Sequence, residues 1–376
     1  MTRLGFVGTG WIGRNRMEAI LATGVAKAVA IYDPNPEMAH EAQALAPGAR
    51  LTDSLEELLT LHFDGIVIAT PSALHAQQCI AALKAGVAVF CQKPLGRNAA
   101  EVEGVLDAAR RADRLLGVDL SYRHTAAMQA IRDRVRAGEL GHVFAADLVF
   151  HNAYGPQSGW FWDPQLSGGG CLIDLGVHLV DLALWMVDFP EVLEARATLL
   201  RDGRPVREDE VEDYATGELK LANGTTVRLA CSWNLDAGQD AEISARFYGT
   251  EAGAEMRNES GSFFDFSADL LRGRERERLA SPPDAWGGRA AVEWLMRLDK
   301  GERFNGTTAG LLETARALDR LYASVRHHGV EGSPERPTRP GQRLVQAQGR
   351  PRPDEIKAGR VQPARQAENA AAPAGD

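Results

Sequence analysis

A glycine-rich turn directly after the first apolar strand constrains the fold of this chain more than any other feature. Gly8, Gly10 and Gly13 form the pattern G-x-G-x-x-G between that strand and a helical segment. Gly8 permits a tight exit from the strand, Gly10 lets the backbone approach a pyrophosphate, and Gly13 lets the helix pack against the sheet. The N–H groups that open the helix, at Trp11 and Ile12, would then face the phosphates. The pattern predicts a dinucleotide-binding turn, although an ordinary turn can hold the same glycines.

An acidic residue follows the second predicted strand at the spacing of a dinucleotide site. Asp33 ends strand 28–32, twenty residues after Gly13. A carboxylate at this place accepts hydrogen bonds from the adenosine ribose and repels a 2′-phosphate. Residues 34–36 contain no Arg that could receive such a phosphate. We therefore expect the cofactor to be NAD rather than NADP.

Short apolar runs alternate with helical patterns along the first third of the chain. Such alternation predicts a parallel, doubly wound α/β sheet. We expect an NAD(P)-binding Rossmann domain over residues 1–121. Its predicted strands are 4–8, 28–32, 65–69, 87–91 and 115–119, and its predicted helices are 12–23, 36–46, 54–60, 73–85 and 98–112.

After residue 121 the strands become longer and show period-two alternation of apolar residues. This pattern predicts a mainly antiparallel sheet with one face packed on helices. The other face is then solvated or pairs with another subunit. We expect this α/β domain over residues 122–330. Its elements are helix 125–137, strand 142–152 with Phe144, Ala146, Leu148 and Phe150 on one face, helix 170–187, strand 225–234 with Val227, Leu229, Cys231 and Trp233 on one face, strand 242–248, and helix 306–327.

Composition limits the class of protein and its partners. The chain has 376 residues and a formal net charge of −9, which suits two domains and argues against a nucleic-acid partner. Its four Cys form no C-x-x-C pair, as expected in a reducing cytoplasm. The first strand leaves no room for a signal peptide, and no apolar run approaches 18 residues. We therefore expect a cytoplasmic protein without a membrane partner.

The C-terminal region contains two features without a predicted binding role. His327 and His328 end the last predicted helix, where cations interact favourably with the helix dipole, and this explains them better than a metal does. Residues 331–376 are rich in Pro, Arg, Gln and Ala and show almost no apolar periodicity. Such a segment cannot bury a core, so we expect a disordered tail. No metal site is predicted.

Two short stretches follow predicted strands at the sheet edge where ligands bind in open α/β folds. Thr70 and Pro71 follow strand 65–69 and would line the cofactor cleft. His75 begins the next helix, where it would touch the cofactor or have no role. Lys93 and Pro94 follow strand 87–91, and the lysine is either a functional group or part of a plain turn. We predict a cis peptide bond before Pro94, since X-Pro bonds lose most of the preference for trans.

Polar residues recur on one face of the apolar helix 170–187. Asp174, His178 and Asp181 lie at positions i, i+4 and i+7 after three consecutive glycines. Burying such a stripe without a purpose is costly. The alternatives are a capped core helix with satisfied polar groups, or a metal site, for which no third ligand is evident.

Together these stretches resemble the family named after glucose-fructose oxidoreductase, inositol dehydrogenase and the rhizopine catabolism protein, Gfo/Idh/MocA. The resemblance covers residues 3–328 and includes G-x-G-x-x-G, A-T-P-x-x-x-H, the K-P turn, Tyr122 and Arg123, and G-G-G-x-L-x-D-x-G-x-H-x-x-D. It implies a Rossmann domain joined to an α/β domain with a large, mostly antiparallel sheet. Members often form homodimers or homotetramers through that sheet.

The resemblance implies that Lys93, Asp174 and His178 are the catalytic group. A His is suited to take the proton when a secondary alcohol loses a hydride to nicotinamide, and a Lys can stabilise the charge on the substrate oxygen. Asp174 would orient a substrate hydroxyl or the imidazole. One residue departs from the family: Gln92 stands where Glu usually precedes Lys-Pro, which removes one carboxylate near the nicotinamide.

Aromatic and polar residues that flank the second-domain strand and loop are candidates for the substrate pocket. Aromatic rings stack on sugar faces, although a Trp-Phe-Trp cluster is equally often packing. These candidates are Arg123, His151, Trp160, Phe161 and Trp162.

Three functions compete on these grounds. The first is an NAD(P)-dependent oxidoreductase acting on a secondary alcohol or carbonyl of a sugar, polyol or cyclitol. The second is an enzyme of the same fold that retains NAD and cleaves a glycosidic bond. The third is a non-enzymatic nucleotide-sensing regulator, against which the intact Lys93, Asp174 and His178 weigh.

Overall fold

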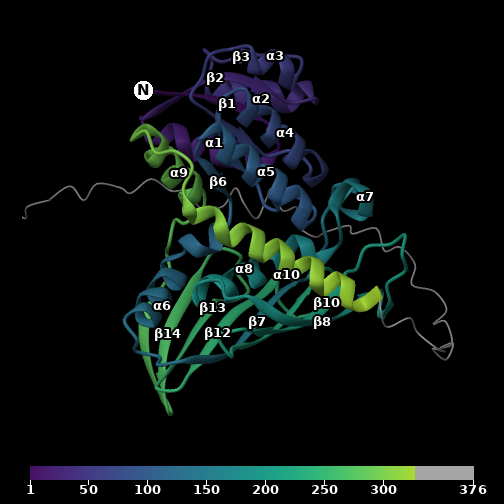
Figure 1. Ribbon diagram of the computed structural model, residues 1–376, viewed down its shortest axis with the longest axis vertical. Helices are drawn as coiled ribbons and strands as arrows, with labels where there is room; N and C mark the ends of the chain where they lie inside the picture. The colour runs from purple at the N-terminus through teal and green to yellow at the C-terminus, as the bar shows by residue number, and fades with distance from the viewer. Residues whose placement is uncertain (327–376) are drawn as a thin grey trace, which may run out of the picture. The chain divides into compact units, whose positions relative to one another are not determined.

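The computed structural model describes residues 1–326 (Figure 1). The predictions for His327, His328 and residues 331–376 lie outside these described residues. Two sheets organise the described chain, one of six strands and one of nine. The predicted α/β fold, a Rossmann domain followed by a domain with a large sheet, is confirmed.

The first sheet is parallel throughout, with strand order β3-β2-β1-β4-β5-β6. Because β2 and β4 flank β1 and the chain winds outward in both directions, a crevice opens at the carboxyl end of β1. The predicted elements are confirmed, and the two-residue strand β3 is an addition. The strands are β1 (Thr2–Val7), β2 (Ala26–Tyr32), β3 (Arg50–Leu51), β4 (Gly65–Ile68), β5 (Ala88–Cys91) and β6 (Leu116–Val118), and the helices are α1 (Trp11–Ala22), α2 (Pro36–Leu45), α3 (Leu55–Leu59), α4 (Ser72–Lys84) and α5 (Ala99–Ala112).

Helix α9 (Arg289–Asp299), which the sequence analysis did not predict, packs on the first sheet. It lies more than 150 residues after the last strand of that sheet in the sequence. Trp294 of α9 lies against Phe90 of β5, with ring centroids 5.7 Å apart. A Cβ at Gly117 would approach the Trp294 ring to 2.8 Å, and a Cβ at Gly65 would approach it to 2.7 Å. Glycines on β4 and β6 therefore make room for the indole.

The second sheet has the order β15-β14-β13-β12-β7-β11-β10-β8-β9. Only its β7–β11 pair is parallel, so the prediction of a mainly antiparallel sheet is confirmed. Helices α6 (Ala126–Arg136), α8 (Val177–Met186) and α10 (Ala309–Arg326) lie on one side of it (Figure 1). The strands are β7 (Val143–Asn152), β8 (Val192–Arg201), β9 (Arg204–Pro205), β10 (Tyr214–Leu221), β11 (Thr226–Ser232), β12 (Ala241–Gly249), β13 (Gly253–Asn258), β14 (Phe266–Arg272) and β15 (Glu275–Ala280).

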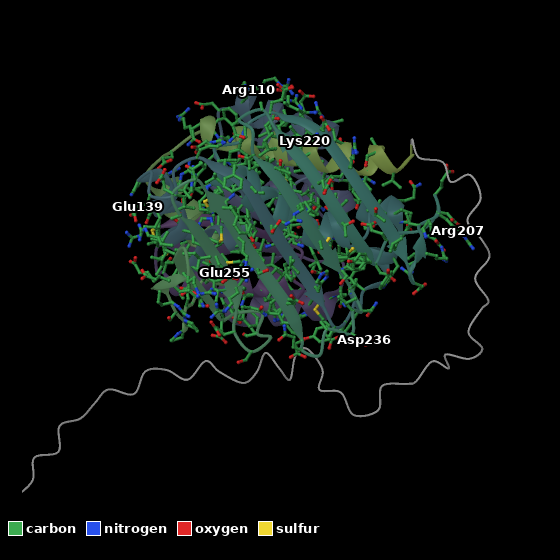
Figure 2. All side chains as sticks on the ribbon, turned by 90° about the horizontal axis from the view of Figure 1, so that it is seen from below. Arg110, Glu139, Arg207, Lys220, Asp236 and Glu255 are labelled. Atoms are coloured by element: carbon green, nitrogen blue, oxygen red, sulfur yellow. The ribbon has the colours of Figure 1, made fainter. Side chains whose placement is uncertain are left out.

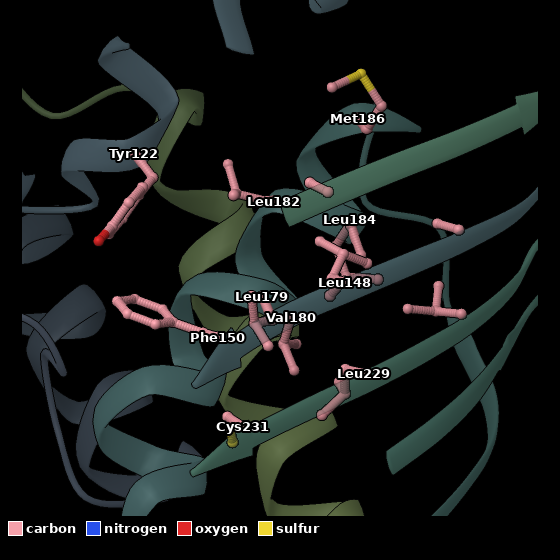
Figure 3. Packing of buried hydrophobic residues seen from close by; sticks show 14 of the residues in the cluster. Tyr122, Leu148, Phe150, Leu179, Val180, Leu182, Leu184, Met186, Leu229 and Cys231 are labelled. Atoms are coloured by element: carbon pink, nitrogen blue, oxygen red, sulfur yellow. The ribbon is translucent and has the colours of Figure 1, made fainter. Parts of the chain in front are cut away.

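The core of this domain lies between α8 and the sheet (Figure 3). Leu148 and Phe150 of β7 and Leu229 of β11 face Leu179 and Leu182 of α8, and all are buried. Residues 164–186 are long and apolar enough to cross a membrane, but 89% of their 18-residue apolar window is buried within the described chain. The segment therefore has the character of a core helix.

The prediction that Phe144 faces the core with the other apolar residues of its strand is wrong. Phe144 is 48% exposed, while its neighbour Val143 is 5% exposed. The register of β7 against β12 shifts at this point, because Tyr248 pairs with Ala145 and Gly249 pairs with Val143. The extra residue is a β-bulge, which reverses the direction of the side chains before it.

Candidate active site

The turn after β5 meets the start of the α8 segment at an ion pair. The Nζ of Lys93 donates to Oδ1 of Asp174 at 2.6 Å and to the Asp174 carbonyl at 2.7 Å. The second carboxylate oxygen accepts from Nε1 of Trp233 at 3.2 Å. The Lys93-Pro94 peptide bond is cis, as predicted. The sequence did not identify Trp233 as a site residue, although it ended the inward stripe of strand 225–234.

Asp174 lies in a π-helical turn, Leu172–Gly176, and not in the α-helix that the periodicity predicted. Glu212 holds the start of this turn, since its Oε1 accepts from the backbone N–H of Gly170 at 3.0 Å and of Leu172 at 2.9 Å. A Cβ at Gly170 would lie 1.9 Å from the carbonyl oxygen of Glu212, so the close approach requires glycine. Single π-turns inside helices occur frequently at functional sites.

His178 is enclosed by aromatic rings. Its centroid lies 4.8 Å from that of Tyr122 and 6.3 Å from that of Phe150, two residues that Figure 3 shows at the edge of the core. Burial, followed by the positive charges of Lys93 and Arg16, holds the pKa of His178 well below its ordinary value. No hydrogen bond to this imidazole occurs within residues 1–326. A neutral imidazole with a free nitrogen is competent to accept a proton.

The glycine turn has the geometry of a phosphate cradle. Gly8 adopts φ 78°, and a Cβ there would lie 2.6 Å from the backbone of Ala69. A Cβ at Gly13 would lie 2.1 Å from the carbonyl oxygen of Gly8, whereas a Cβ at Gly10 would meet nothing within 4 Å. Trp11 and Ile12 begin α1 directly after Gly10, and Trp11 is 44% exposed. The turn is thus closed towards the sheet and open where a pyrophosphate would bind, which fits a dinucleotide.

Asp33 lies beside this turn at the carboxyl end of β2. Its Oδ2 accepts from the backbone N–H of Thr9 at 2.6 Å, and its Oδ1 accepts from that of Asn35 at 2.9 Å. These bonds hold the carboxylate next to Gly8 and Gly10, where a ribose would contact it. The position agrees with the sequence-based expectation.

His75 connects two loops of the cleft and is not open to a ligand. It is 1% exposed, and its ring nitrogens lie 2.7 Å from the carbonyl oxygen of Pro94 and 2.7 Å from that of Thr70. The expected contact with cofactor is therefore not supported by its placement. Thr70 donates its hydroxyl to Gln78 at 2.6 Å. Thr70 and Pro71 are partly exposed at the end of β4, as expected of residues that line the cleft.

Two predicted pocket residues do not join the group around Lys93. Arg123 makes a two-bonded ion pair with the carboxylate of Asp181, which is 1% exposed. His151 bonds to Ser232 at 2.8 Å and stacks on Tyr214. Because Phe150 faces His178 and successive strand residues alternate, His151 points to the opposite face of the sheet.

The aromatic segment Gly159–Trp162 reaches the site through Trp233. The rings of Trp162 and Phe161 both pack edge-on against Trp233. Their centroids lie 5.1 Å and 6.2 Å, respectively, from that of Trp233. Trp160 stacks on Phe161 at 3.7 Å. The structure therefore connects Trp162 to Asp174 by way of Trp233, which itself bonds to the carboxylate.

Comparison with known proteins identifies the family of the chain. The model of an oxidoreductase family with an NAD-binding Rossmann fold matches residues 2–120, and the model of the GFO/IDH/MocA C-terminal domain matches residues 128–255. The chain is 32% identical to inositol 2-dehydrogenase of Acidiphilium cryptum, over 68% of this chain and 73% of that protein. It is 29% identical to D-glucoside 3-dehydrogenase of Escherichia coli K12, over 57% of this chain and 66% of that protein.

A solved structure of similar fold is levoglucosan dehydrogenase in complex with NADH and L-sorbose. The TM-score is 0.74 at 20% sequence identity, and the match covers 87% of this chain and 97% of that one. The two family models together match the whole first sheet and the second sheet from β7 to the start of β13. The chain therefore belongs to the Gfo/Idh/MocA family of oxidoreductases.

Proposed function

We propose that this oxidoreductase transfers a hydride between NAD and a CH–OH carbon of a sugar, polyol or cyclitol. The observation that carries the proposal is the convergence of three groups, the Lys93 ammonium, the Asp174 carboxylate and the uncharged His178 imidazole. The relatives named as inositol and glucoside dehydrogenases support this substrate class.

Each of the three groups has a distinct task in the oxidation. Bound NAD supplies the hydride acceptor. His178 accepts the hydroxyl proton of the substrate, because it is neutral and has a free nitrogen. Lys93 donates a hydrogen bond to the substrate oxygen and stabilises its growing negative charge. Asp174 holds Lys93 in place and accepts from a neighbouring substrate hydroxyl. In the reverse direction His178 returns the proton.

The cofactor site favours NAD over NADP. Asp33 already accepts two backbone N–H groups beside the glycine turn, and its carboxylate would repel a 2′-phosphate. We expect kcat/KM to be higher with NAD than with NADP. Equal or higher kcat/KM with NADP would contradict this assignment.

Absorbance at 340 nm tests the proposed activity. The purified protein is mixed with NAD or NADP and a panel of sugars, polyols and inositols, and at least one compound should generate reduced cofactor. A flat absorbance with every compound contradicts the proposal. If a glycoside is cleaved at the same time, the NAD-retaining alternative is favoured, whereas NAD binding without any turnover favours the regulator.

We place the enzyme in the cytoplasm as a homodimer or homotetramer with a small-molecule substrate. All four Cys are unpaired and buried, which suits a reducing compartment. The sheet face opposite α8 offers a broad surface for a second copy (Figure 2). Light scattering of the purified protein measures the assembly, and a monomeric mass at micromolar concentration contradicts it.

A further inference from the structure

A buried carboxylate lies where α1, the residue before Lys93 and the end of β6 meet. Asp119 is 1% exposed. Its Oδ2 accepts a hydrogen bond from Nε of Arg16 at 2.6 Å and another from the Gln92 side-chain amide. Its backbone N–H donates to the carbonyl of Cys91 at 2.9 Å. The carboxylate thus joins the helix that starts at the glycine turn to the strand end that carries Lys93.

These three side chains are balanced in charge. The Arg16 side chain is 7% exposed, and a guanidinium at this depth requires a paired carboxylate. Gln92 is 7% exposed and neutral, so it can donate to Asp119 without adding charge. A Glu at position 92 would place a second carboxylate against the first. A neutral Gln at position 92 is therefore compatible with the carboxylate of Asp119, whereas a Glu would be repelled by it.

One carboxylate oxygen of Asp119 is buried without a hydrogen bond. Oδ1 is buried and has no hydrogen-bond partner within the part of the chain that the structure describes. Buried polar atoms are almost always satisfied, so each exception needs an explanation. Such local violations are expected at functional sites, where stability is not the only requirement.

We propose that Asp119 is a positioning residue of the active site, which supplies from the end of β6 the buried carboxylate that position 92 lacks. Through Gln92 it holds the Lys93 turn, and through Arg16 it holds α1, so that the two cofactor-facing segments keep their spacing. It also neutralises Arg16, whose charge reaches His178. The role in catalysis rests on the proposed function, whereas the test below uses folding and NAD affinity.

The test moves the carboxylate from one side chain to the other. Asp119→Asn leaves Arg16 buried without a charged partner, and Gln92→Glu adds a second carboxylate. We expect each single variant to lower the thermal unfolding midpoint and to weaken NAD binding by about 10- to 100-fold, the size of effect known for residues that orient metal ligands from behind. The double variant, with one carboxylate again opposite Arg16, should recover most of both properties.

A matched control uses another buried carboxylate. Asp181 is also 1% exposed and pairs with Arg123, but it does not contact Gln92. Gln92→Glu should therefore not rescue Asp181→Asn. Unfolding is followed by calorimetry and NAD binding by titration calorimetry, so both readouts are independent of the substrate.

Two results would overturn the proposal. In the first, Asp119→Asn alone keeps the parental NAD affinity, whether or not its unfolding midpoint falls, which would make Asp119 a structural residue only. In the second, the double variant is no better folded and binds NAD no better than the worse single variant. If Asp119→Asn does not fold at all, the double variant decides: a folded, NAD-binding double variant supports the proposal, and an unfolded one refutes it.

Discussion

The two faces of the nine-stranded sheet hold charge in opposite ways. On the side of α8 each ion pair stands alone, the partly buried Lys93 with Asp174, and Arg123 with the fully buried Asp181. On the opposite face two buried acids, Glu255, which Figure 2 labels, and Asp269, each contact several guanidinium groups. The arginines of this network are Arg246, Arg257, Arg276 and Arg278.

The difference separates charges that can act in chemistry from charges that fix a surface. A buried ion with a single partner is left uncompensated when that partner is lost, which is strongly destabilising. Under the proposed function, Lys93 can also exchange its partner for a substrate oxygen. An acid shared among arginines retains other partners after any one loss. We therefore expect single substitutions to have large effects on the α8 side and small effects on the outer face.

The largest expected effect is at His178. His178→Ala removes the proton acceptor, and kcat should fall by about 10²- to 10⁴-fold, equivalent to roughly 3 to 5 kcal/mol of transition-state stabilisation. NAD affinity should remain, because the ring contacts of His178 are with Tyr122 and Phe150 and not with the glycine turn. Turnover, NAD titration and thermal unfolding are measured together. A folded variant with turnover within about threefold of the parent would show that His178 is only a packing residue.

The next effect concerns the stability of the α8 side. Asp181→Ala leaves the Arg123 guanidinium, whose side chain is 17% exposed, without its carboxylate. The free energy of unfolding should fall by about 3 to 5 kcal/mol, as for other buried pairs that lose one partner. Urea denaturation measures this loss. A decrease below about 1 kcal/mol would place the pair among surface ion pairs and break the comparison between the faces.

The pH dependence sharpens the assignment of His178. Burial lowers its pKa, so the imidazole takes up a proton only at a pH below the ordinary range and remains a base in mildly acidic solution. A histidine of ordinary pKa would lose roughly 90% of its basic form at pH 5.5. We expect kcat/KM for oxidation to be nearly the same at pH 5.5 as at pH 6.5. A decline of about fivefold over that interval, as a histidine of ordinary pKa would give, would contradict the depressed pKa.

The Rossmann half was predictable because its determinants are local. Alternating apolar runs, the glycine turn and caps such as Asn98, whose side chain accepts from the N–H of Glu101, are all readable within a few residues. The unpredicted helix α9 packs on this sheet, although in the sequence it follows every strand of the second sheet. Local sequence patterns do not predict packing between segments so far apart in the chain.

The second domain was harder because single-residue irregularities change what a side chain faces. The bulge at Phe144 and the π-turn that contains Asp174 hardly disturb the apolar periodicity of the sequence, so the periodicity does not reveal them. The residues of the proposed catalytic group were chosen from motifs, whereas the contacts that hold the site together were not predicted. Asp119 bonds to Arg16 across 103 positions, and Trp233 bonds to Asp174 across 59, so these contacts follow only from the fold.

On the outer face, loss of one arginine should be tolerated. Arg276 contacts both Glu255 and Asp269, but Arg246 remains with Glu255 and Arg278 remains with Asp269. We expect Arg276→Ala to lower the free energy of unfolding by no more than about 1 kcal/mol, as for partly exposed ion pairs. Urea denaturation beside Asp181→Ala measures the contrast. Equal losses in the two variants would mean that sharing does not protect the network.

The smallest effect is expected at a pair of that face whose arginine is mostly exposed. Arg228 of β11 makes two bonds of 2.8 Å to the carboxylate of Asp147 on the neighbouring strand, a geometry as good as that of Arg123 with Asp181. Its side chain is nevertheless 66% exposed, so water replaces the partner when either residue is removed, and the ions gain little from each other. Arg228→Ala should leave the unfolding midpoint and kcat/KM unchanged within experimental error, at both low and high salt. A clear destabilisation that disappears with Asp147→Ala in the background would show that geometry, and not burial, determines the strength of these pairs. The contrast between the two faces would then depend on the hydrogen-bond geometry of each ion pair and not on its burial.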